Sequence, residues 1–264
     1  MILTEPKIIV PNQRLAQVYR QTNLGVHAYN EDSLYTPNTD LWRSKGLDLR
    51  LYEYPPNNTY VFDRSRYNNH GTITGALWTP QGRSFGGDDL IDIDNTLTKL
   101  STATVGTWEM WGKLTDATPV ALNTLICFGD TDDDESLHLR VLATGKISVS
   151  CVDAGVDDWV FSTNNVLITD NTFFHLVLIQ NGVSPILIVN GQLVAITFSI
   201  EVDKTTWFSQ LTGLDNGRIG CSNRNTAGNA AFLTGSVGEV RFYNRALSTG
   251  EVRQNYLATK WRYQ

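Results

Sequence analysis

The chain has 264 residues, enough for one large β-type domain or two ordinary domains. Its 21 Gly and 8 Pro are close to average usage, which excludes a collagen-like or low-complexity chain. Only 18% of the residues are charged and the net charge is -6 without any run of Lys or Arg, which excludes the basic surface of a nucleic-acid-binding protein.

The first 46 residues differ in character from the rest, because their apolar residues do not alternate and three prolines interrupt them, Pro6, Pro11 and Pro37. We interpret residues 1–46 as an extended N-terminal arm. A short helix is predicted at Asn12–Gln21, where apolar residues recur at i, i+3 and i+4. A helix of this length needs a surface to lie on, either its own sandwich or a neighbouring subunit. Both alternatives stay open.

The N-terminal sequence MILTEPKIIV does not resemble a signal peptide, because Glu5 and Pro6 interrupt the apolar run and no basic region precedes it. No later stretch has the length and apolar character of a membrane span. The three cysteines, Cys127, Cys151 and Cys221, have no metal-binding spacing, and we expect them to be reduced core residues. The sequence therefore favours synthesis and folding in a cytoplasm.

From Leu47 onward, short alternating segments are separated by turn residues at intervals typical of a β-sandwich or barrel. The clearest region is Phe174–Phe198, where Asn181-Gly182 and Asn190-Gly191 each separate two apolar runs. Asn-Gly is the strongest short-range hairpin signal, since both residues tolerate a positive φ. We expect three consecutive antiparallel strands there.

A capping box at Ser248–Glu251 predicts a short C-terminal helix with Val252, Tyr256 and Leu257 on one side. We expect it to be the only helix of residues 47–264.

Five segments, in order and at suitable spacing, together resemble a known family. They are Val61–Ile73 (VFDRSRYNNHGTI), Ser84–Ile93 (SFGGDDLIDI), Thr107–Leu114 (TWEMWGKL), Thr172–Ala195 with FFHLVLIQNG and LIVNGQLVA, and Gly235–Ser248 (GSVGEVRFYNRALS). The pattern resembles the laminin G-like branch of the concanavalin A-like lectin and glucanase superfamily. This resemblance implies an all-β fold, a two-sheet antiparallel jelly-roll sandwich over residues 47–264.

The chain departs from the family pattern at two glycines. Gly86 and Gly238 stand where the family commonly has Asp. Each change removes a carboxylate, and calcium needs 6 to 8 oxygen ligands. We therefore do not expect the structural calcium that related sandwiches hold near the penultimate strand.

The densest acidic stretch is a second candidate for calcium. Asp130, Asp132 and Asp134 match the first half of an EF-hand spacing, but Glu135 and Val141 occupy the positions of its Gly and closing Glu. The alternatives are a solvated turn and a calcium loop of another type. The same two alternatives apply to the turn with Asp63, Asn68 and Asn69.

A sugar site needs an aromatic ring for stacking and polar side chains for the hydroxyls. The candidates are Trp159, Trp207 and three polar residues of one loop, Asn223, Arg224 and Asn229. The alternative for each tryptophan is packing in the core.

A glycosidase would need paired carboxylates on one sheet face, for which Asp92 and Asp94 are the candidates. The third acid of a glucanase pattern is absent after them, and the four histidines are scattered without metal spacing. We therefore predict that the chain is not an enzyme.

These observations favour a structural or surface-display binding module, a virion (phage or virus) structural or decoration protein with a lectin-like domain. Residues 1–46 would attach it to other subunits, it would form a homo-oligomer, and it would lie on the virion or particle surface. The alternative is a carbohydrate-binding lectin that adheres to cell-surface glycans, and a third possibility is a glycoside hydrolase. Calcium is the one cofactor for which the sequence offers ligands.

Overall fold

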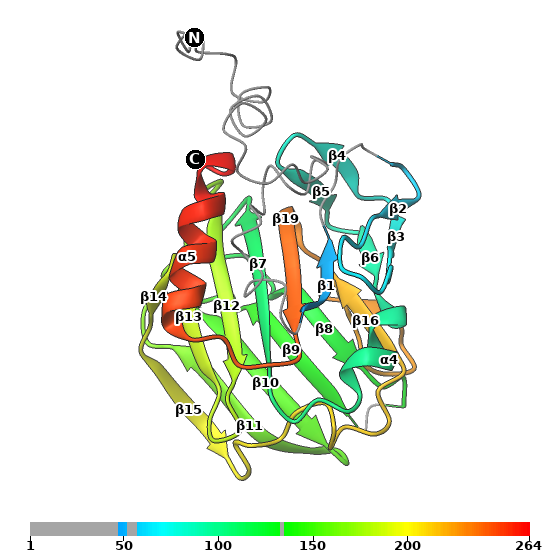
Figure 1. The fold of residues 1–264 in the computed structure, drawn as a ribbon, viewed down its shortest axis with the longest axis vertical. Coiled ribbons are helices and arrows are strands. Elements are labelled where there is room, and N and C mark those ends of the chain that lie inside the picture. Colours follow the sequence, from blue (N-terminus) through cyan, green and yellow to red (C-terminus); the bar gives the residue numbers. More distant parts are fainter. Residues whose placement is uncertain (1–46, 52–56, 133–134) are drawn as a thin grey trace, which may run out of the picture. The chain divides into compact units, whose positions relative to one another are not determined.

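A computed structural model describes residues 47–51, 57–132 and 135–264 of the chain. Most regular structure in these ranges is antiparallel β-strand, arranged in two large sheets that pack face to face (Figure 1). The predicted all-β, two-sheet antiparallel jelly-roll sandwich is confirmed. The expected arm (residues 1–46) and the helix predicted at Asn12–Gln21 lie outside the described residues.

One sheet has eight strands in the order β14-β13-β12-β7-β19-β5-β4, and β1 also pairs with β19. Its strands are β1 (Leu47–Leu51), β4 (Leu77–Thr79), β5 (Gly82–Gly86), β7 (Gly106–Leu114), β12 (Phe174–Gln180), β13 (Ile186–Val189), β14 (Gln192–Leu193) and β19 (Thr234–Tyr243).

The other sheet has nine strands in the order β15-β11-β10-β9-β8-β16-β6-β3-β2. They are β2 (Tyr60–Val61), β3 (Gly71–Thr74), β6 (Leu90–Asp92), β8 (Asn123–Gly129), β9 (Ser136–Val141), β10 (Ile147–Asp153), β11 (Val156–Thr163), β15 (Ile196–Glu201) and β16 (Asn216–Ile219). A separate small hairpin follows, formed by β17 (Ser222–Asn223) and β18 (Asn229–Ala230).

Aromatic side chains fill the space between the sheets. The Trp108 ring on β7 has its centroid 5.4 Å from that of Phe128 on β8, 5.4 Å from Trp207 and 5.6 Å from Phe242. Burying each such side chain stabilises the fold by roughly 1.5–3 kcal/mol. The core therefore joins strands that lie far apart in the sequence.

The hairpin region contains the three predicted antiparallel strands, β12, β13 and β14. Asn190 and Gly191 both have positive φ, 51° and 74°, as a two-residue turn requires. At Asn181-Gly182 only the glycine is in the left-handed region, and the Asn181 side chain accepts the backbone N–H of Val183. The first loop is therefore longer than a two-residue turn, and β15 afterwards joins the other sheet.

The C-terminal helix α5 (Thr249–Thr259) begins with the predicted capping box of Ser248 and Glu251. It packs on the outer face of the eight-stranded sheet (Figure 1), and a 3-10 turn, η3 (Lys260–Arg262), follows it. Val252 is buried, whereas Leu257 is 48% exposed, contrary to the predicted face. Asn255 is buried instead, because its Nδ2 donates to Glu109 Oε2 on β7 at 2.7 Å.

The expectation that residues 47–264 contain a single helix is wrong, because the structure has a second short helix. It is α4 (Leu97–Leu100), preceded by the 3-10 turn η2 (Asp94–Thr96). One helical turn is too short for a periodic sequence signal. None of the helices in the described part of the chain has the length and apolar character that a membrane span requires.

Candidate ligand-binding face

The outer face of the nine-stranded sheet follows from the alternation of side chains on β9. Leu137 and Leu139 enter the core, so His138 and Arg140 lie on the opposite face. The helix α5 packs on the outer face of the eight-stranded sheet, so it does not cover this face of the nine-stranded sheet (Figure 1).

A row of hydroxyl-bearing residues crosses this face on both sides of Arg140. Strand pairing places Thr124 of β8 and Ser148 of β10 beside Arg140. Ser162 of β11 and Thr197 of β15 continue the row. Side chains directly opposite one another in paired strands have Cβ atoms about 4.5–5.5 Å apart, so these five form a continuous polar strip, the Arg140 row.

Arg140 is half-buried and forms no ion pair with the described residues, although the carboxylate of Asp157 acts on its charge from farther away. None of their carboxylates lies within 4.0 Å of its guanidinium. Its one hydrogen bond in the described structure joins Nη1 to His138 Nδ1 at 3.5 Å, and its buried Nε has no partner there. Burial lowers the pKa of Arg140, and the charge of Arg224 lowers that pKa further. An arginine nevertheless stays protonated in proteins, so the face keeps a positive charge.

His138 is 2% exposed and supplies a second unused donor. Burial lowers its pKa to about 3, with further contributions from Arg140 and Arg224, so the imidazole is neutral near pH 7. Because a guanidinium only donates, the ring nitrogen facing Arg140 must accept, and the proton lies on Nε2. This buried Nε2 has no hydrogen-bond partner among the described residues.

The β17–β18 hairpin brings the loop of the sequence prediction to the same face. A methyl group on Gly129 of β8 would collide with the carbonyl oxygen of Asn223, so the first strand of the hairpin lies directly on β8. Arg224 follows Asn223, and its charge acts on both His138 and Arg140. Asn223 Oδ1 is buried without a partner among the described residues, whereas Asn229 is exposed and accepts from the Cys221 thiol at 3.7 Å.

Arg218 on β16 shares this face but has counter-ions. Its Nη1 lies 3.2 Å from Asp92 Oδ2 and also contacts Asp94 Oδ1. Asp92 and Asp94 therefore point the same way, as the alternation predicted, and hold an arginine. Arg140 differs from Arg218 in lacking such carboxylates.

Neither predicted tryptophan offers a ring face to a sugar. Trp159 is 0% exposed and stacks on Phe161 with ring centroids 5.9 Å apart. Trp207 is 1% exposed and packs on Trp108. The alternative of core packing holds for both rings, because both side chains point between the sheets. The three cysteines are buried and unpaired, as expected.

The acidic turn after β8 is held by hydrogen bonds within the protein. Asp130 Oδ1 accepts the backbone N–H of Asp132 at 3.2 Å, and Glu135 Oε2 accepts that of Gly213 at 2.5 Å. Burial raises the pKa of both Asp130 and Glu135. Asp134 lies outside the described residues, and within them no three His, Cys, Asp or Glu side chains form a group that could hold a metal.

The turn with Asp63 is also organised by protein donors. Its carboxylate accepts the backbone N–H groups of Arg50, Ser65 and Asn69, and the Ser65 hydroxyl, at 2.7–2.9 Å. These four bonds use the lone pairs that a calcium ion would need. Of the two alternatives for this turn, the structure favours the ion-free one.

Gly238 and Gly86, the two departures from the family pattern, have different neighbours. The Tyr263 ring lies against Gly238, where a side chain would collide with it, and the Tyr263 hydroxyl accepts the Glu239 N–H at 2.8 Å. The N–H of Gly86 donates to Asp89 Oδ2 at 2.6 Å.

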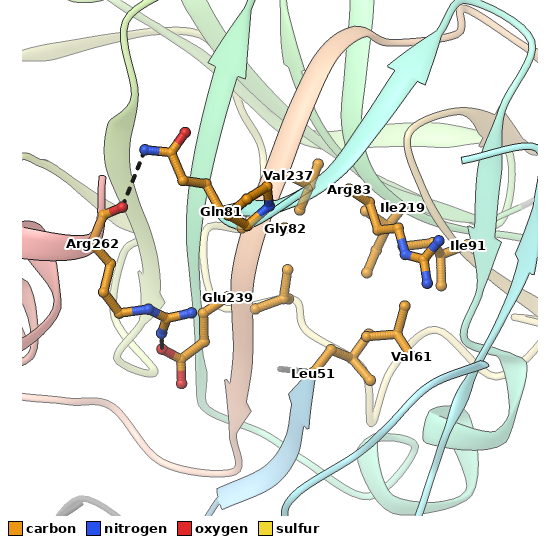
Figure 2. A pocket seen from close by; sticks show the side chains of 13 residues that line it. Leu51, Val61, Gln81, Gly82, Arg83, Ile91, Ile219, Val237, Glu239 and Arg262 are labelled. Carbon is orange, nitrogen blue, oxygen red and sulfur yellow. Dashed lines mark hydrogen bonds and ion pairs between the residues drawn. The ribbon is translucent and has the colours of Figure 1, made fainter. Parts of the chain in front are cut away.

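Two hollows in the described structure are less suited to a sugar than the Arg140 row. The cavity in Figure 2 lies between the sheets, between Val61 and Ile91 on one side and Val237 on the other, with Arg262 hydrogen-bonded to Glu239 at its edge. The centre of a water molecule can occupy a volume of about 20 Å³ in this cavity, which is room for roughly one water.

The larger hollow is an open groove of about 500 Å³ between residues 115–123 and 231–234. Asp116 and Asn123, two of its polar side chains, already accept from the backbone N–H groups of Thr118 and Thr234. Val120 is fully exposed beside them. The groove therefore has few unused polar groups for sugar hydroxyls.

A laminin G model, described as the concanavalin A-like lectin/glucanases superfamily, matches residues 85–253. No curated protein sequence matches the chain significantly. Among solved structures, the CBM40 module of the Ruminococcus gnavus IT-sialidase, bound to α2,3-sialyllactose, is similar, with a TM-score of 0.54 and 18% identity. The match covers 69% of this chain and 96% of that module.

Two sialidase structures are also similar. The NanB sialidase from Streptococcus pneumoniae has 23% identity and a TM-score of 0.56, over 69% of this chain and 27% of that one. The Trypanosoma rangeli sialidase has 17% identity and a TM-score of 0.58, over 82% of this chain and 33% of that one. The chain thus corresponds to a third or less of each sialidase, and the likeness shows a shared β-sandwich fold.

Proposed function

The chain belongs to the concanavalin A-like lectin/glucanase superfamily and has the β-sandwich fold of carbohydrate-binding modules, and we propose that it binds a glycan without cleaving it. The glycan site is the outer face of the nine-stranded sheet at the Arg140 row. A fold does not define a function, so the proposal rests on this surface.

The unused polar groups of that face carry the proposal. Thr124 Oγ1, His138 Nε2 and Arg140 Nε are buried without partners in the described structure. The neighbouring Ser162 is half-buried and Thr197 is exposed, so the row reaches solvent on the β15 side. Buried polar groups usually have partners, so these three unpaired atoms need an explanation. Because the atoms themselves are covered, a polar ligand would first contact the half-buried Arg140 and Ser162 and the exposed Thr197. With both candidate tryptophans in the core, we expect hydrogen bonds rather than ring stacking to dominate recognition.

The absence of cleavage in the proposal is supported by the carboxylates of the same sheet. Asp92 and Asp94 are held by Arg218, and Asp94 Oδ1 also accepts the Gly217 N–H at 2.7 Å. Carboxylates engaged in this way are poorly placed to act as a free acid and nucleophile pair.

A glycan array tests the proposed function, with sialylated glycans included because a similar module binds sialyllactose. We expect binding by the full chain, and a weakening of about three- to tenfold in Ser162→Ala, which loses one hydrogen-bonding group of the row. Ser101→Ala, an exposed position after α4, is the matched control. If the folded protein binds no glycan with calcium or with a chelator, the proposal is wrong.

We further propose that this module is displayed on the surface of a virion or another particle, as a homo-oligomer anchored through residues 1–46. The prolines in that segment and its lack of alternating residues support an anchoring role. Deletion of residues 1–46 should abolish incorporation into the particle and leave glycan binding by residues 47–264 intact. Incorporation of the truncated protein at the normal level would contradict the anchoring role.

A further inference from the structure

We propose that the glycan bound by this face carries an anionic group, a carboxylate or a sulfate, and that Arg140 binds it beside His138. This inference rests on the proposed glycan-binding function and specifies the chemical class of the ligand.

The first argument is the contrast between Arg140 and other buried or half-buried arginines. Arg50 has Glu239 at 2.5 Å, Arg241 has Glu109 at 3.2 Å, and Arg218 has Asp92 at 3.2 Å. Among the described residues, Arg140 has a neutral imidazole as its hydrogen-bond partner and no carboxylate within 4.0 Å, and Asp157 acts on it only from farther away. Burying a charge without a counter-ion is costly, and an anion from outside would remove that cost.

The second argument is the arrangement of donors around that charge. Arg140 Nε and His138 Nε2 are both buried N–H donors without acceptors in the described structure. Arg224, from the β17–β18 turn, is close enough to lower the pKa of both side chains. The Arg140 guanidinium and the His138 N–H are donors of the kind that an oxyanion needs, and the charge of Arg224 makes their surroundings more positive.

The third argument is the surroundings of the charge. Ser148 lies opposite Arg140 on β10, and Ser162 follows on β11. Neither hydroxyl makes a hydrogen bond to the described residues. A free inorganic anion would leave these hydroxyls unused, whereas an acidic sugar places its own hydroxyls beside its anionic group. The row therefore fits an acidic sugar better than a simple ion.

Calorimetry with the full chain tests this inference. The probes are a sialylated, a uronic-acid-containing and a sulfated oligosaccharide, each beside its neutral counterpart, at two salt concentrations. We expect at least one acidic probe to bind about tenfold or more tightly than its counterpart, since hydrogen bonds to charged groups are the stronger ones. The carboxylate and sulfate probes distinguish the two possible anions.

Arg140→Gln should remove this preference and leave the binding of neutral probes within about twofold of the original. Arg253→Gln, an exposed position on α5, loses the same charge from the other sheet and is the control. If Arg140→Gln does not fold, the salt dependence of the unmodified protein decides, because higher salt should weaken acidic probes only.

The possible failures can be distinguished. Equal affinity for acidic and neutral probes, or an unchanged preference in folded Arg140→Gln, overturns the anion inference and leaves the glycan-binding function standing. Binding of no probe of either class overturns both. Binding of inorganic sulfate as tightly as the sulfated sugar would also contradict the inference, since the hydroxyl row would then contribute nothing.

Discussion

Glu239 is a buried carboxylate shared by three arginines. Its oxygens lie 2.5 Å from Arg50, 2.9 Å from Arg241 and 3.3 Å from Arg262. Burial alone would raise the pKa of Glu239, but the attraction of Arg241, Arg50 and Arg262 outweighs it and holds that pKa well below the ordinary value. This one side chain therefore connects β1, β19 and the C-terminal turn.

Replacing this carboxylate should be strongly destabilising. Glu239→Gln keeps the shape but leaves three buried guanidinium groups facing a neutral amide. We expect the free energy of unfolding at pH 7 to fall by about 3 kcal/mol or more, measured by urea denaturation. Glu201→Gln, which removes an exposed partner of Lys204, should cost about 0.5 kcal/mol or less. Equal losses in the two variants would show that the Glu239 network contributes no more than a surface pair.

At the scale of single elements, the Asn190-Gly191 turn joins β13 and β14 and also touches α5. A Cβ on Gly191 would lie 2.9 Å from the Tyr256 ring, and its φ is 74°. Gly228 has a similar φ of 81° but no atom within 4 Å of such a Cβ. Gly228→Ala should therefore cost about 1 kcal/mol for the backbone alone. Gly191→Ala should cost more, and equal melting temperatures for the two variants would contradict the contact with α5.

The C-terminal turn after α5 closes over the eight-stranded sheet through Tyr263. Its ring stacks on Trp111 at 4.4 Å, and its hydroxyl accepts the Glu239 N–H. Tyr263→Phe leaves that buried N–H unpaired and should cost about 1–3 kcal/mol in chemical denaturation. Tyr263→Ala also loses the ring and should cost about 3–5 kcal/mol. A loss under about 1 kcal/mol in Tyr263→Ala would mean that this segment does not contribute to the fold.

The elements predicted correctly from the sequence are those that local chemistry determines. Asn190-Gly191 forms its turn because both residues adopt positive φ, and Ser248 caps α5 together with Glu251 three residues later. The strands alternate because each has one face in the core. The helix α4 was missed because a single turn has no period.

The candidate site depended on information that no local pattern contains. Arg140 lies beside Ser148 and Thr124 only through the register of three strands, and the charge of Arg224 acts on Arg140 because a later hairpin folds back onto β8. Trp159 was a candidate for stacking on a sugar, but strand alternation turns its ring inward with Phe161. One sequence signal could have indicated Arg140. It is a charged residue that alternates with leucines in a predicted strand, with serines in the next predicted strand along the chain.

Across the whole molecule, Glu109 and Glu239 on one outer face differ from Arg140 on the other in how their charge is neutralised. On the eight-stranded sheet, Glu109 and Glu239 are both surrounded by cations or hydrogen-bond donors, so those charges are neutralised within the protein. On the nine-stranded sheet, Arg140 and the neutral His138 have no carboxylate partner among the described residues. We therefore expect the Glu109 and Glu239 network to stabilise the fold and the burial of Arg140 and His138 to cost stability.

This difference predicts how the stability of the molecule depends on pH. The pKa of His138 is about 3 in the folded protein against 6.5 ordinarily. As the pH falls below about 6.5, His138 binds a proton in the unfolded chain but not in the folded protein. The stability that this residue contributes above pH 6.5 is therefore progressively lost on acidification. The loss from this one group should reach about 2 kcal/mol at pH 5. Glu109 and Glu239, whose pKa values are lowered, keep their contribution until the pH falls through those lower values.

Replacing His138 isolates this contribution, because the acidic groups are common to both proteins and cancel in the comparison. The free energy of unfolding is measured for both proteins by urea denaturation at each pH. When the pH is lowered from 8 to 5, the difference between them should shift by about 2 kcal/mol in favour of His138→Gln. An acidic glycan bound at Arg140 would add a counter-charge beside the imidazole and make its protonation less unfavourable, so saturating ligand should reduce the difference between the two proteins. Parallel pH profiles without ligand would show that the pKa of His138 is not lowered in the folded protein, and the description of this imidazole as neutral at pH 5 would then be wrong.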